Sequence, residues 1–309
     1  MDPLRSFKAF IKVAETGSFS EAARRIGVAT SVVKKRVDQL ESSARVLLIR
    51  RSTRRIELTE AGQSHLAAMR RAVHGMDQAL AGVQQHSPRI EGRLRIKAPT
   101  TLTDFYLGDV LARFQRAHPA VALELIVRDG PVDPVLDGFD IAISMSPGSF
   151  AGVTEFELCE AKRLIVAAPT YLAGGRPRIP QDLQRHDVLG FVPTGSAWHF
   201  GSKTGPIVVT VEPRFSSNDG RQVLRAALMG HGIACLSEYL VAPAIERGDL
   251  VTLLEEFPVP DYWIRVQVPD AQRNQLSVQA LVDCLKAEFT PSPPWRRAGG
   301  KGATGARPV

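Results

Sequence analysis

The sequence has few cysteines and no long apolar run. Its three cysteines, Cys159, Cys235 and Cys284, are odd in number and far apart, which fits neither a disulfide framework nor a metal pair, so we expect buried free thiols. No stretch approaches the ~18 consecutive apolar residues of a transmembrane helix. The N-terminus carries an acid at position 2 and lacks the continuous apolar core of a secretory signal. We therefore expect a cytoplasmic protein that does not bind membranes.

Catalytic motifs are lacking as well. The sequence contains no H-E-x-x-H, no G-x-x-x-x-G-K and no G-x-S-x-G. The seven histidines are scattered, and no two of them lie three or four residues apart as metal ligands on a helix would. These absences predict a protein that is not an enzyme and that uses no cofactor or metal.

Positive charge, by contrast, is concentrated at the two ends. Residues 1–60 hold 13 Lys and Arg against 7 Asp and Glu, a net charge of +6. Residues 291–309 hold four cations and no acid, which leaves −3 for residues 61–290 of a chain whose total is +7. A basic head on a mildly acidic body predicts a polyanionic partner for the head.

The head has the pattern of a helix-turn-helix. Its first helix is indicated by apolar residues spaced by three and four, namely Leu4, Phe7, Ile11 and Ala14. Ser18 and Glu21 form a capping-box pattern for the second helix, and Gly27 permits a tight turn after it. Thr30 or Ser31 can cap a third helix, whose inward residues are Val33, Val37 and Leu40. A helix of this kind fits a DNA major groove, and a solvated charged face is the alternative.

A basic hairpin is predicted to follow. Residues 46–59, VLLIRRSTRRIELT, read as a strand, an arginine-rich turn and a returning strand. Such a wing grips phosphates or reaches into a minor groove. The candidate DNA-binding residues are Ser18, Thr30, Ser31, Lys34, Lys35, Arg36, Arg50, Arg51, Ser52, Thr53, Arg54 and Arg55.

These motifs together resemble the LysR-type transcriptional regulators. The resemblance rests on AARRIGV (22–28), Ser31, Val33, the Leu40–Glu41 pair, Arg51, the basic wing and LTEAG (58–62), and it extends to about residue 290. It implies an α/β protein with a winged helix-turn-helix at 1–60, a dimerising linker helix at 61–90 and an effector-binding domain at 91–290. It also implies four partners, namely double-stranded DNA, a small-molecule effector, further copies in a dimer or tetramer, and RNA polymerase.

The head departs from the family pattern at several positions. Ala29 replaces the usual serine, Lys34–Lys35 replaces serine–arginine, Ala44–Arg45 replaces leucine–glycine, and Ile49 replaces phenylalanine. Lysine lacks the flat two-pronged donor of arginine for guanine. Arg45 costs on the order of 1 kcal/mol if its backbone is left-handed. The alternative function is thus a small-molecule-binding module with a degenerate, largely non-specific DNA-binding head.

The linker carries a heptad-like apolar seam. Its members, which step by three and four, are Leu66, Met69, Val73, Met76, Leu80 and Val83. We expect this seam to form the dimer, although a helix packed on a core would show the same stripe. A dimer would present two recognition helices to a roughly palindromic operator.

The body alternates strand and helix patterns, which predicts parallel sheets with crossover helices. The family resemblance implies two lobes like those of a periplasmic binding protein, the first at 91–162 and 267–290 and the second at 163–266, with a ligand between them. We expect a small organic anion at strand ends and helix N-termini. The candidate effector-binding residues are Thr100, Thr101, Thr103, Arg128, Ser144, Thr194, Ser217 and Asn218.

Each of these positions has a structural alternative. The hydroxyls and Asn218 can serve as helix caps alone, and Arg128 can lie in solvent. The run Trp198, His199 and Phe200 can line the second lobe or pack in its core. The basic tail, residues 291–309, is rich in Pro, Gly and Arg and is predicted to be disordered.

Overall fold

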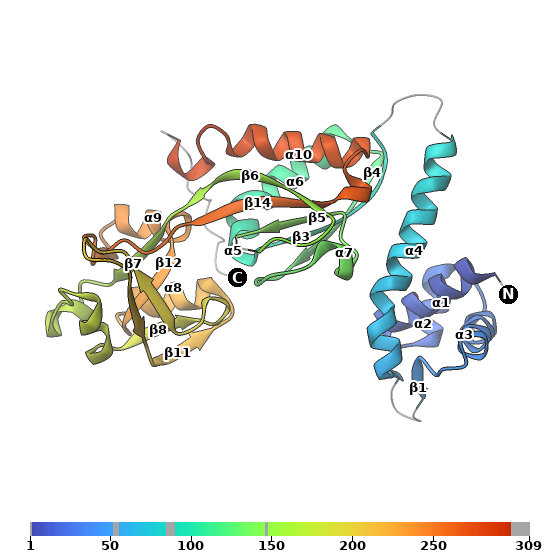
Figure 1. The fold of residues 1–309 in the computed structure, drawn as a ribbon, viewed down its shortest axis with the longest axis horizontal. Helices are drawn as coiled ribbons and strands as arrows, with labels where there is room; N and C mark the ends of the chain where they lie inside the picture. Colours follow the sequence, from blue (N-terminus) through green and yellow to red (C-terminus); the bar gives the residue numbers. More distant parts are fainter. Residues whose placement is uncertain (1, 52–55, 85–89, 146–147, 298–309) are drawn as a thin grey trace. The chain divides into compact units, whose positions relative to one another are not determined.

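The chain folds into two compact units in the computed structural model (Figure 1), the first made of Met1–Gly92 with Val135–Gly138 and the second of Arg93–Pro134 with the residues from Phe139 onward. The structure describes residues 2–51, 56–84, 90–145 and 148–297. Among these residues, no helix has the length and hydrophobicity needed to cross a membrane. The two units are described separately.

Three short helices form the head, α1 (Pro3–Thr16), α2 (Phe19–Ile26) and α3 (Thr30–Ala44). Asp2 caps α1, and the Ser18 hydroxyl accepts from the amide of Glu21 at the start of α2, as predicted. The N-cap of α3 is Ala29, which has no side chain to accept a hydrogen bond, so the prediction that Thr30 or Ser31 caps this helix is wrong.

The core of the head is built from the apolar faces of these helices. Val33, Val37 and Leu40 are buried, which confirms the predicted inner face of α3. In α1 the fully buried residues are Ala9, Phe10 and Val13, while Leu4, Phe7 and Ala14 lie at the edge of the face. Gly27 ends α2 in the left-handed region with φ 73°, and Arg45 ends α3 there with φ 54°. Arg45 therefore occupies the backbone conformation for which its substitution is unfavourable.

The wing is a short antiparallel pair of strands, β1 (Ile49–Arg51) and β2 (Ile56–Leu58), and its tip, residues 52–55, lies outside the described residues. Glu41 attaches the wing to α3 because its buried carboxylate accepts from the amides of Leu48 (2.8 Å) and Ile49 (2.9 Å). A buried carboxylate is stable only when it is hydrogen-bonded in this way.

The linker helix α4 (Glu60–Gln84) starts directly after the wing. Thr59 caps it, since its hydroxyl oxygen accepts from the amide of Gly62 (3.0 Å). A Cβ at Gly62 would lie 2.1 Å from the carbonyl oxygen of Leu48, so no larger residue fits there. Leu66 and Met69 pack against the core of the head, as in the alternative of a core-facing stripe, whereas Met76 is half-exposed. The side chains of Leu80 and Val83 lie outside the described residues.

The first lobe of the second unit is a five-stranded sheet in the order β4-β3-β5-β14-β6. Its strands are β3 (Gly92–Ala98), β4 (Val121–Val127), β5 (Ile141–Ser144), β6 (Val153–Ala161) and β14 (Tyr262–Pro269). Strands β3 and β5 are parallel, as predicted, but β14 is antiparallel to both of its neighbours. Because β14 pairs with β6 along its whole length, the chain returns to this lobe at Tyr262 and not at residue 267.

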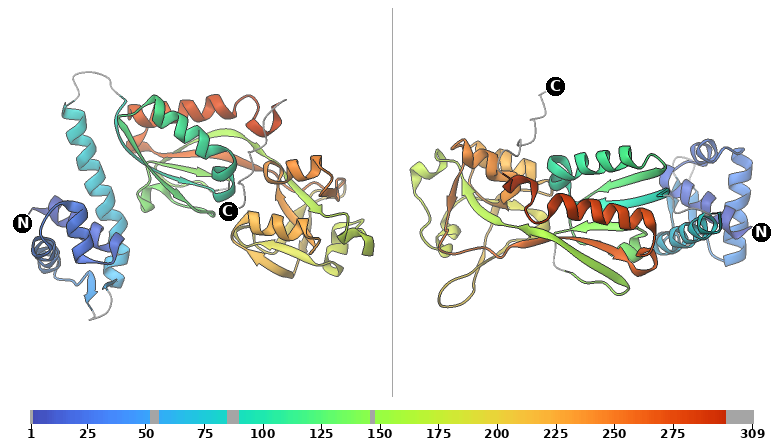
Figure 2. Two further views of the ribbon diagram at one scale, coloured as in Figure 1. Left: turned by 180° about the vertical axis from the view of Figure 1, so that it is seen from behind. Right: turned by 90° about the horizontal axis from the view of Figure 1, so that it is seen from above.

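Two helices cover this sheet side by side, α6 (Gly108–Ala117) and α10 (Leu276–Phe289) (Figure 2). The helix α6 continues from α5 (Thr100–Leu102) through a π-helical turn at Thr103–Leu107. After β4 comes the short helix α7 (Pro134–Asp137). The strands and helices expected for this lobe are thus present near their predicted positions.

The second lobe is a sheet in the order β11-β8-β12-β7-β13. Its strands are β7 (Arg163–Ala167), β8 (Val188–Phe191), β11 (Pro213–Ser217), β12 (Ile233–Ser237) and β13 (Val251–Leu253). The helices α8 (Gly220–Leu228) and α9 (Glu238–Glu246) pack against it, and a hairpin of β9 (Ala197–Phe200) and β10 (Ile207–Thr210) stands beside it. Trp198 and Phe200 are buried in the core of this lobe, so the core-packing alternative holds for both, and His199 is exposed.

The C-terminal segment is ordered further than predicted. Residues 291–297 continue from α10 and include a 3-10 turn at Pro294–Arg296, so the prediction of a disordered tail from 291 is wrong for these residues. Trp295 packs against rings of both lobes, Tyr106 and Phe289 in the first and Tyr239 in the second. Residues 298–309 lie outside the described part of the chain.

Candidate functional site

One face of α3 carries cations that lie in solvent. Lys34 and Lys35 are exposed and Arg36 is half-buried, because Val33 and Val37 turn the opposite face into the core. Ser31, Lys34, Lys35 and Asp38 line a shallow hollow along this exposed face. Within the described part of the chain, neither lysine nor Arg36 forms an ion pair. Their charge is therefore available to an external polyanion.

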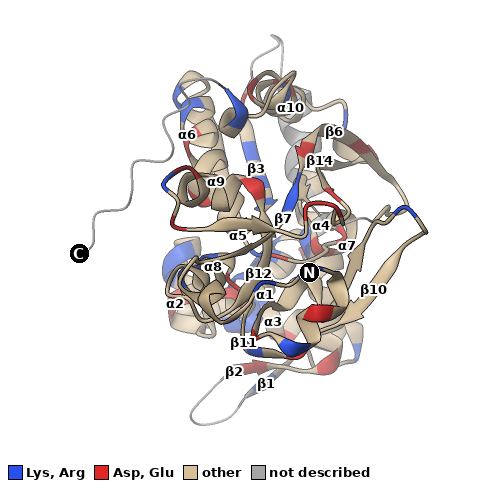
Figure 3. Cartoon of the chain, turned by 90° about the vertical axis from the view of Figure 1, so that its left-hand side faces the viewer, with Lys and Arg blue, Asp and Glu red and all other residues tan. Residues whose placement is uncertain are grey.

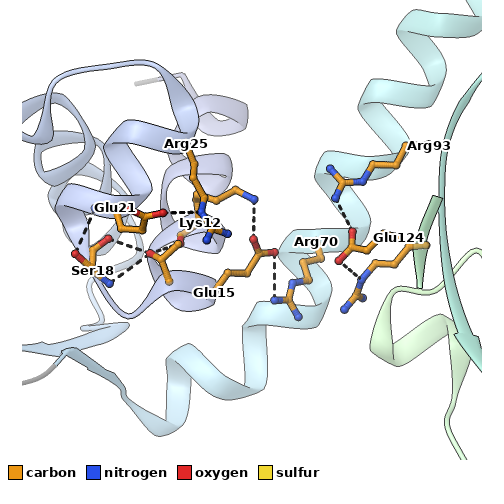
Figure 4. Close-up of polar contacts among 10 residues, drawn as sticks. Lys12, Glu15, Ser18, Glu21, Arg25, Arg70, Arg93 and Glu124 are labelled. Atoms are coloured by element: carbon orange, nitrogen blue, oxygen red, sulfur yellow. Dashed lines mark hydrogen bonds and ion pairs between the residues drawn. The ribbon is translucent and has the colours of Figure 1, made fainter. Parts of the chain in front are cut away.

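Several other cations of the head are paired. Arg24 and Arg25 both reach the carboxylate of Glu21, at 2.7 and 2.9 Å. Glu15 receives Lys12 at 2.7 Å and, across to α4, Arg70 at 3.5 Å (Figure 4). Among the described residues, the unpaired positive charge of the head therefore lies on α3, at the exposed Arg45 that follows α3, and at the exposed Arg50 of β1. Charges of both signs are spread over the rest of the fold (Figure 3).

A second candidate site is a cavity between the lobes of the second unit. About 70 Å³ inside it can be occupied by the centres of water-sized molecules, which leaves room for a small ligand. Its lining residues are Lys97, Pro99, Thr101, Asp129, Gly130, Met145, Arg163, Phe191, Pro193, Thr194, Gly220, Cys235, Leu236, Ser237, Tyr239, Leu240 and Tyr262.

Lys97 is the least expected of these residues because its side chain is buried at the end of β3. Its ammonium group donates to the carbonyl oxygens of Gly130 (3.0 Å) and Ile143 (3.3 Å). Burial lowers the pKa of Lys97 to about 8, against the opposing effect of Asp129. The group still carries a positive charge at neutral pH.

Arg163 supplies a second cation at the start of β7. Its guanidinium lies over the ring of Tyr262 (4.6 Å) and donates to the sulfur of Cys235 (3.1 Å). Burial raises the pKa of the Cys235 thiol, and Arg163 opposes that shift. A thiol is a weak acceptor, so this contact leaves the guanidinium without a strong partner.

Two hydroxyls join the lobes across the cavity wall. Thr101, from the first lobe, and Tyr239, from the second, are 2.8 Å apart between their oxygens, and both are buried. Burial raises the pKa of Tyr239 to about 12, so its hydroxyl stays protonated at neutral pH. The contact lies where a molecule bound between the lobes would meet both of them.

Comparison with known proteins identifies the family. Residues 4–63 match the model of the bacterial regulatory helix-turn-helix protein, lysR family, and residues 88–290 match the model of the LysR substrate binding domain. The transcriptional regulator PtxR of Pseudomonas aeruginosa is 31% identical over 293 residues, which are 94% of each chain. This chain belongs to the LysR family of transcriptional regulators.

Solved LysR-type structures share the fold. CrgA from Neisseria meningitidis is similar with a TM-score of 0.59 and 27% identity, over 93% of this chain and 98% of that one. Full-length AphB of Vibrio cholerae has a TM-score of 0.64 over 93% and 99% of the two chains, and at 22% identity this likeness shows the fold alone.

The cavity of this LysR-type regulator contains two of the eight residues expected to bind an effector, Thr101 and Thr194. The others are absent from its lining, and for two of them a local backbone contact holds the side chain. The Thr103 hydroxyl donates to the carbonyl of Pro99 (2.6 Å), and the Ser217 hydroxyl accepts from the amide of Asp219 (3.0 Å). Thr100, Ser144 and Asn218 do not line the cavity either, and their role in effector binding stays a prediction.

At two predicted positions, Arg128 and Asn218, the next residue in the sequence takes the expected role. Arg128 is exposed and lies 5.9 Å from the Phe139 ring, and Asp129 takes the place in the cavity. Asn218 is exposed, and Asp219 caps α8 in its stead. The missed cation Arg163 had a weak signal, since it stands at the edge of an otherwise apolar strand, whereas Lys97 alternates with Arg93 and Arg95 in β3 as solvent-facing residues would.

The predicted DNA-binding residues fall into three groups. Ser31, Lys34, Lys35 and Arg50 are exposed, and Thr30 and Arg36 are half-buried. Ser18 acts as a helix cap. Ser52, Thr53, Arg54 and Arg55, together with the side chain of Arg51, lie outside the described residues. Among the described residues no group of three or more His, Cys, Asp or Glu is arranged to hold a metal ion.

Proposed function

We propose that this regulator binds a roughly palindromic operator as a dimer or tetramer and that a small organic anion in the interlobe cavity alters its binding to promoters. The observation that supports DNA contact through α3 is that Lys34, Lys35 and Arg36 form no ion pair among the described residues, whereas Arg24 and Arg25 of α2 are paired. Contact with RNA polymerase and a cytoplasmic place of action are parts of the same proposal.

The seam of α4 is the proposed dimer contact. Leu66 and Met69 face the core of their own chain, so the part of the seam from Val73 to Val83 would meet the partner, and Met76 is half-exposed there. An exposed methionine on a long helix is suited to such a contact because its side chain adapts to irregular surfaces.

The test compares two double variants that remove equal charge. Lys34→Ala with Lys35→Ala should weaken promoter binding and lower the slope of log affinity against log salt by about 0.9 for each phosphate that is no longer neutralised. Arg24→Ala with Arg25→Ala is the control, because both arginines pair with Glu21 on a different helix from the proposed contact. Affinity is measured by fluorescence anisotropy over a series of salt concentrations. Equal losses in both variants would contradict a specific role for α3.

A module with a degenerate DNA-binding head is the second candidate. The left-handed Arg45 and the uncapped Ala29 favour it, because both weaken the helix that would read the bases. Selection of bound sequences from a random DNA pool separates the two functions. Enrichment of a dyad supports the regulator with a specific operator, and the absence of any consensus supports the module.

A further inference from the structure

The interlobe cavity contains an arginine that has no carboxylate partner. In the described part of the chain, the Arg163 guanidinium forms no ion pair, although carboxylates pair with Arg214, Arg221, Arg247 and Arg265 of the same unit. Its side-chain contacts are a sulfur and an aromatic face, which do not neutralise it. The Asp261 carboxylate is near, but it accepts from the backbone amide of Arg163 (3.2 Å) and forms no ion pair with the guanidinium. A half-buried cation without an ion-pair partner has lost part of its hydration, so the site favours an anionic group from outside the chain.

An unsatisfied acceptor lines the same cavity. The Oδ1 atom of Asp129 accepts from the amide of Thr100 (3.2 Å). Its Oδ2 atom is buried and has no hydrogen-bond partner among the described residues. Leaving a buried carboxylate oxygen unpaired is unfavourable, so the second oxygen points to a hydrogen-bond donor on the ligand.

Three other polar groups of the wall already have partners. Thr101 is bonded to Tyr239, Thr194 donates to the carbonyl of Phe191 (2.9 Å), and Lys97 uses two of its three N–H groups for carbonyl oxygens. The charged groups of the wall that can still bond a ligand are therefore Asp129, Arg163 and the third N–H of Lys97. Apolar side chains, including Met145, Phe191 and Leu240, cover the space between the lobes and can enclose a short carbon chain.

The charges of the lining decide which donor and which anion fit. Lys97 and Arg163 carry two positive charges and Asp129 one negative charge, so one further negative charge makes the lining neutral. A dicarboxylate would give the lining and its ligand together a net negative charge. An amino acid, whose ammonium could meet Asp129, would leave the positive charge uncompensated. A hydroxyl donor on a monocarboxylate satisfies both requirements.

We infer that the effector of this regulator is a hydroxylated monocarboxylic acid, whose carboxylate meets Arg163 and Lys97 and whose hydroxyl donates to Asp129. The inference rests on the proposed function of the cavity and specifies its ligand class. It assigns anion binding to Arg163 and Lys97, and discrimination between hydroxylated and plain acids to Asp129.

The experiment is calorimetric titration of the full-length protein at neutral pH with matched probes. Gluconate and lactate are compared with hexanoate and propionate, which lack hydroxyls, with sorbitol, which lacks the carboxylate, and with glucarate, which has two. We expect at least one hydroxylated acid to bind about tenfold or more tightly than its plain counterpart, as one satisfied hydrogen bond provides. Sorbitol should not bind, and glucarate should bind more weakly than gluconate.

Two variants and a control test which residues are responsible for the affinity for carboxylates and for the preference for hydroxylated acids. Asp129→Ala should remove the preference for the hydroxylated acid and leave the plain acid unchanged, whereas Arg163→Met should weaken every carboxylate. Arg116→Ala, on the exposed side of α6, is the control and should bind all probes as the natural chain does. Each variant is first shown to keep the circular dichroism spectrum and the thermal transition of the natural chain, which verifies that the second unit is folded.

Several outcomes would overturn the inference. These are a plain acid that binds as tightly as its hydroxylated counterpart, an unchanged preference in Asp129→Ala, or no binding by any of the six probes. None of these outcomes would contradict the proposed regulation of promoters, because that function is tested separately by the dyad selection and the α3 variants. Loss of the dyad with retained binding of gluconate or lactate would overturn the proposed function alone.

Discussion

Lys97 is a single residue whose burial links folding to pH. Its pKa is about 8 in the folded chain and 10.5 as the ordinary value, so between these values the unfolded chain holds a proton that the folded chain has lost. Stability contributed by this residue therefore rises with pH across that window, and below about pH 8 the whole cost of the buried charge is present. A shift of this size corresponds to on the order of 3 kcal/mol.

The comparison of Lys97→Met with the natural chain tests this linkage. The natural chain should gain stability relative to the variant by up to about 3 kcal/mol as the pH rises through that window. Urea unfolding followed by tryptophan fluorescence is suitable because Trp198, Trp263 and Trp295 all lie in the second unit. Lys203→Met, at an exposed lysine, should show a constant difference. A constant difference for Lys97→Met as well would refute the linkage.

At the scale of residues, the sequence predicted positions whose environment is local. Val33, Val37 and Leu40 are buried because their spacing alone places them on one face of a helix. Glu41 stands out in the sequence only as part of a motif, since its role depends on amides seven and eight residues away that β1 brings to it. Arg163 and Asp129 line the same cavity only after both sheets have folded. No spacing in the sequence predicts that the two residues come together.

At the scale of elements, the start of α3 lacks a side-chain cap. Ala29 has the extended backbone of an N-cap, with φ −67° and ψ 147°, but no oxygen for the free amides of the first turn. Ala29→Ser should supply that oxygen and stabilise α3 by about 1 kcal/mol. Hydrogen exchange of the amides of residues 32–40 measures the gain, which should be about fivefold in protection.

The control for the cap is a serine elsewhere on the same helix. Ala44→Ser, at the exposed last residue of α3, adds the same hydroxyl without reaching the amides of the first turn. It should leave the protection of residues 32–40 unchanged. An equal change in both variants would mean that the hydroxyl acts by some route other than capping.

The helices and strands themselves were predicted better than the pairing of the strands and the ends of the helices. The alternation of apolar residues indicated most strands of both lobes because each strand has a buried face. The antiparallel course of β14, however, follows from its pairing with β6, a strand far earlier in the sequence. Helix ends moved by one or two residues, as at Asp219, because neighbouring polar residues compete to cap the same helix.

At the scale of the whole effector-binding unit, the C-terminal segment joins the two lobes. Arg296 reaches Glu238 of the second lobe at 2.6 Å and Glu160 of the first at 3.7 Å. Trp295 lies between Tyr106 of one lobe and Tyr239 of the other, at 5.1 and 5.3 Å between ring centroids. Because Tyr239 also bonds Thr101 in the cavity wall, this segment is connected to the site where an effector would bind.

Trp295 should therefore stabilise the closed arrangement of the lobes through its aromatic contacts. Trp295→Ala is expected to destabilise the unit by about 2 kcal/mol, or roughly 4–8 °C in the calorimetric transition. The Trp295 Nε1 has no hydrogen-bond partner among the described residues, so Trp295→Phe should cost much less, since it keeps a ring and removes an unpaired donor. Trp263→Ala, at a side chain that is 40% exposed on β14, is the matched control and should cost less than Trp295→Ala. If Phe and Ala at 295 are equally destabilising, the indole nitrogen has a role that packing does not explain, and if neither matters, the segment does not hold the lobes together.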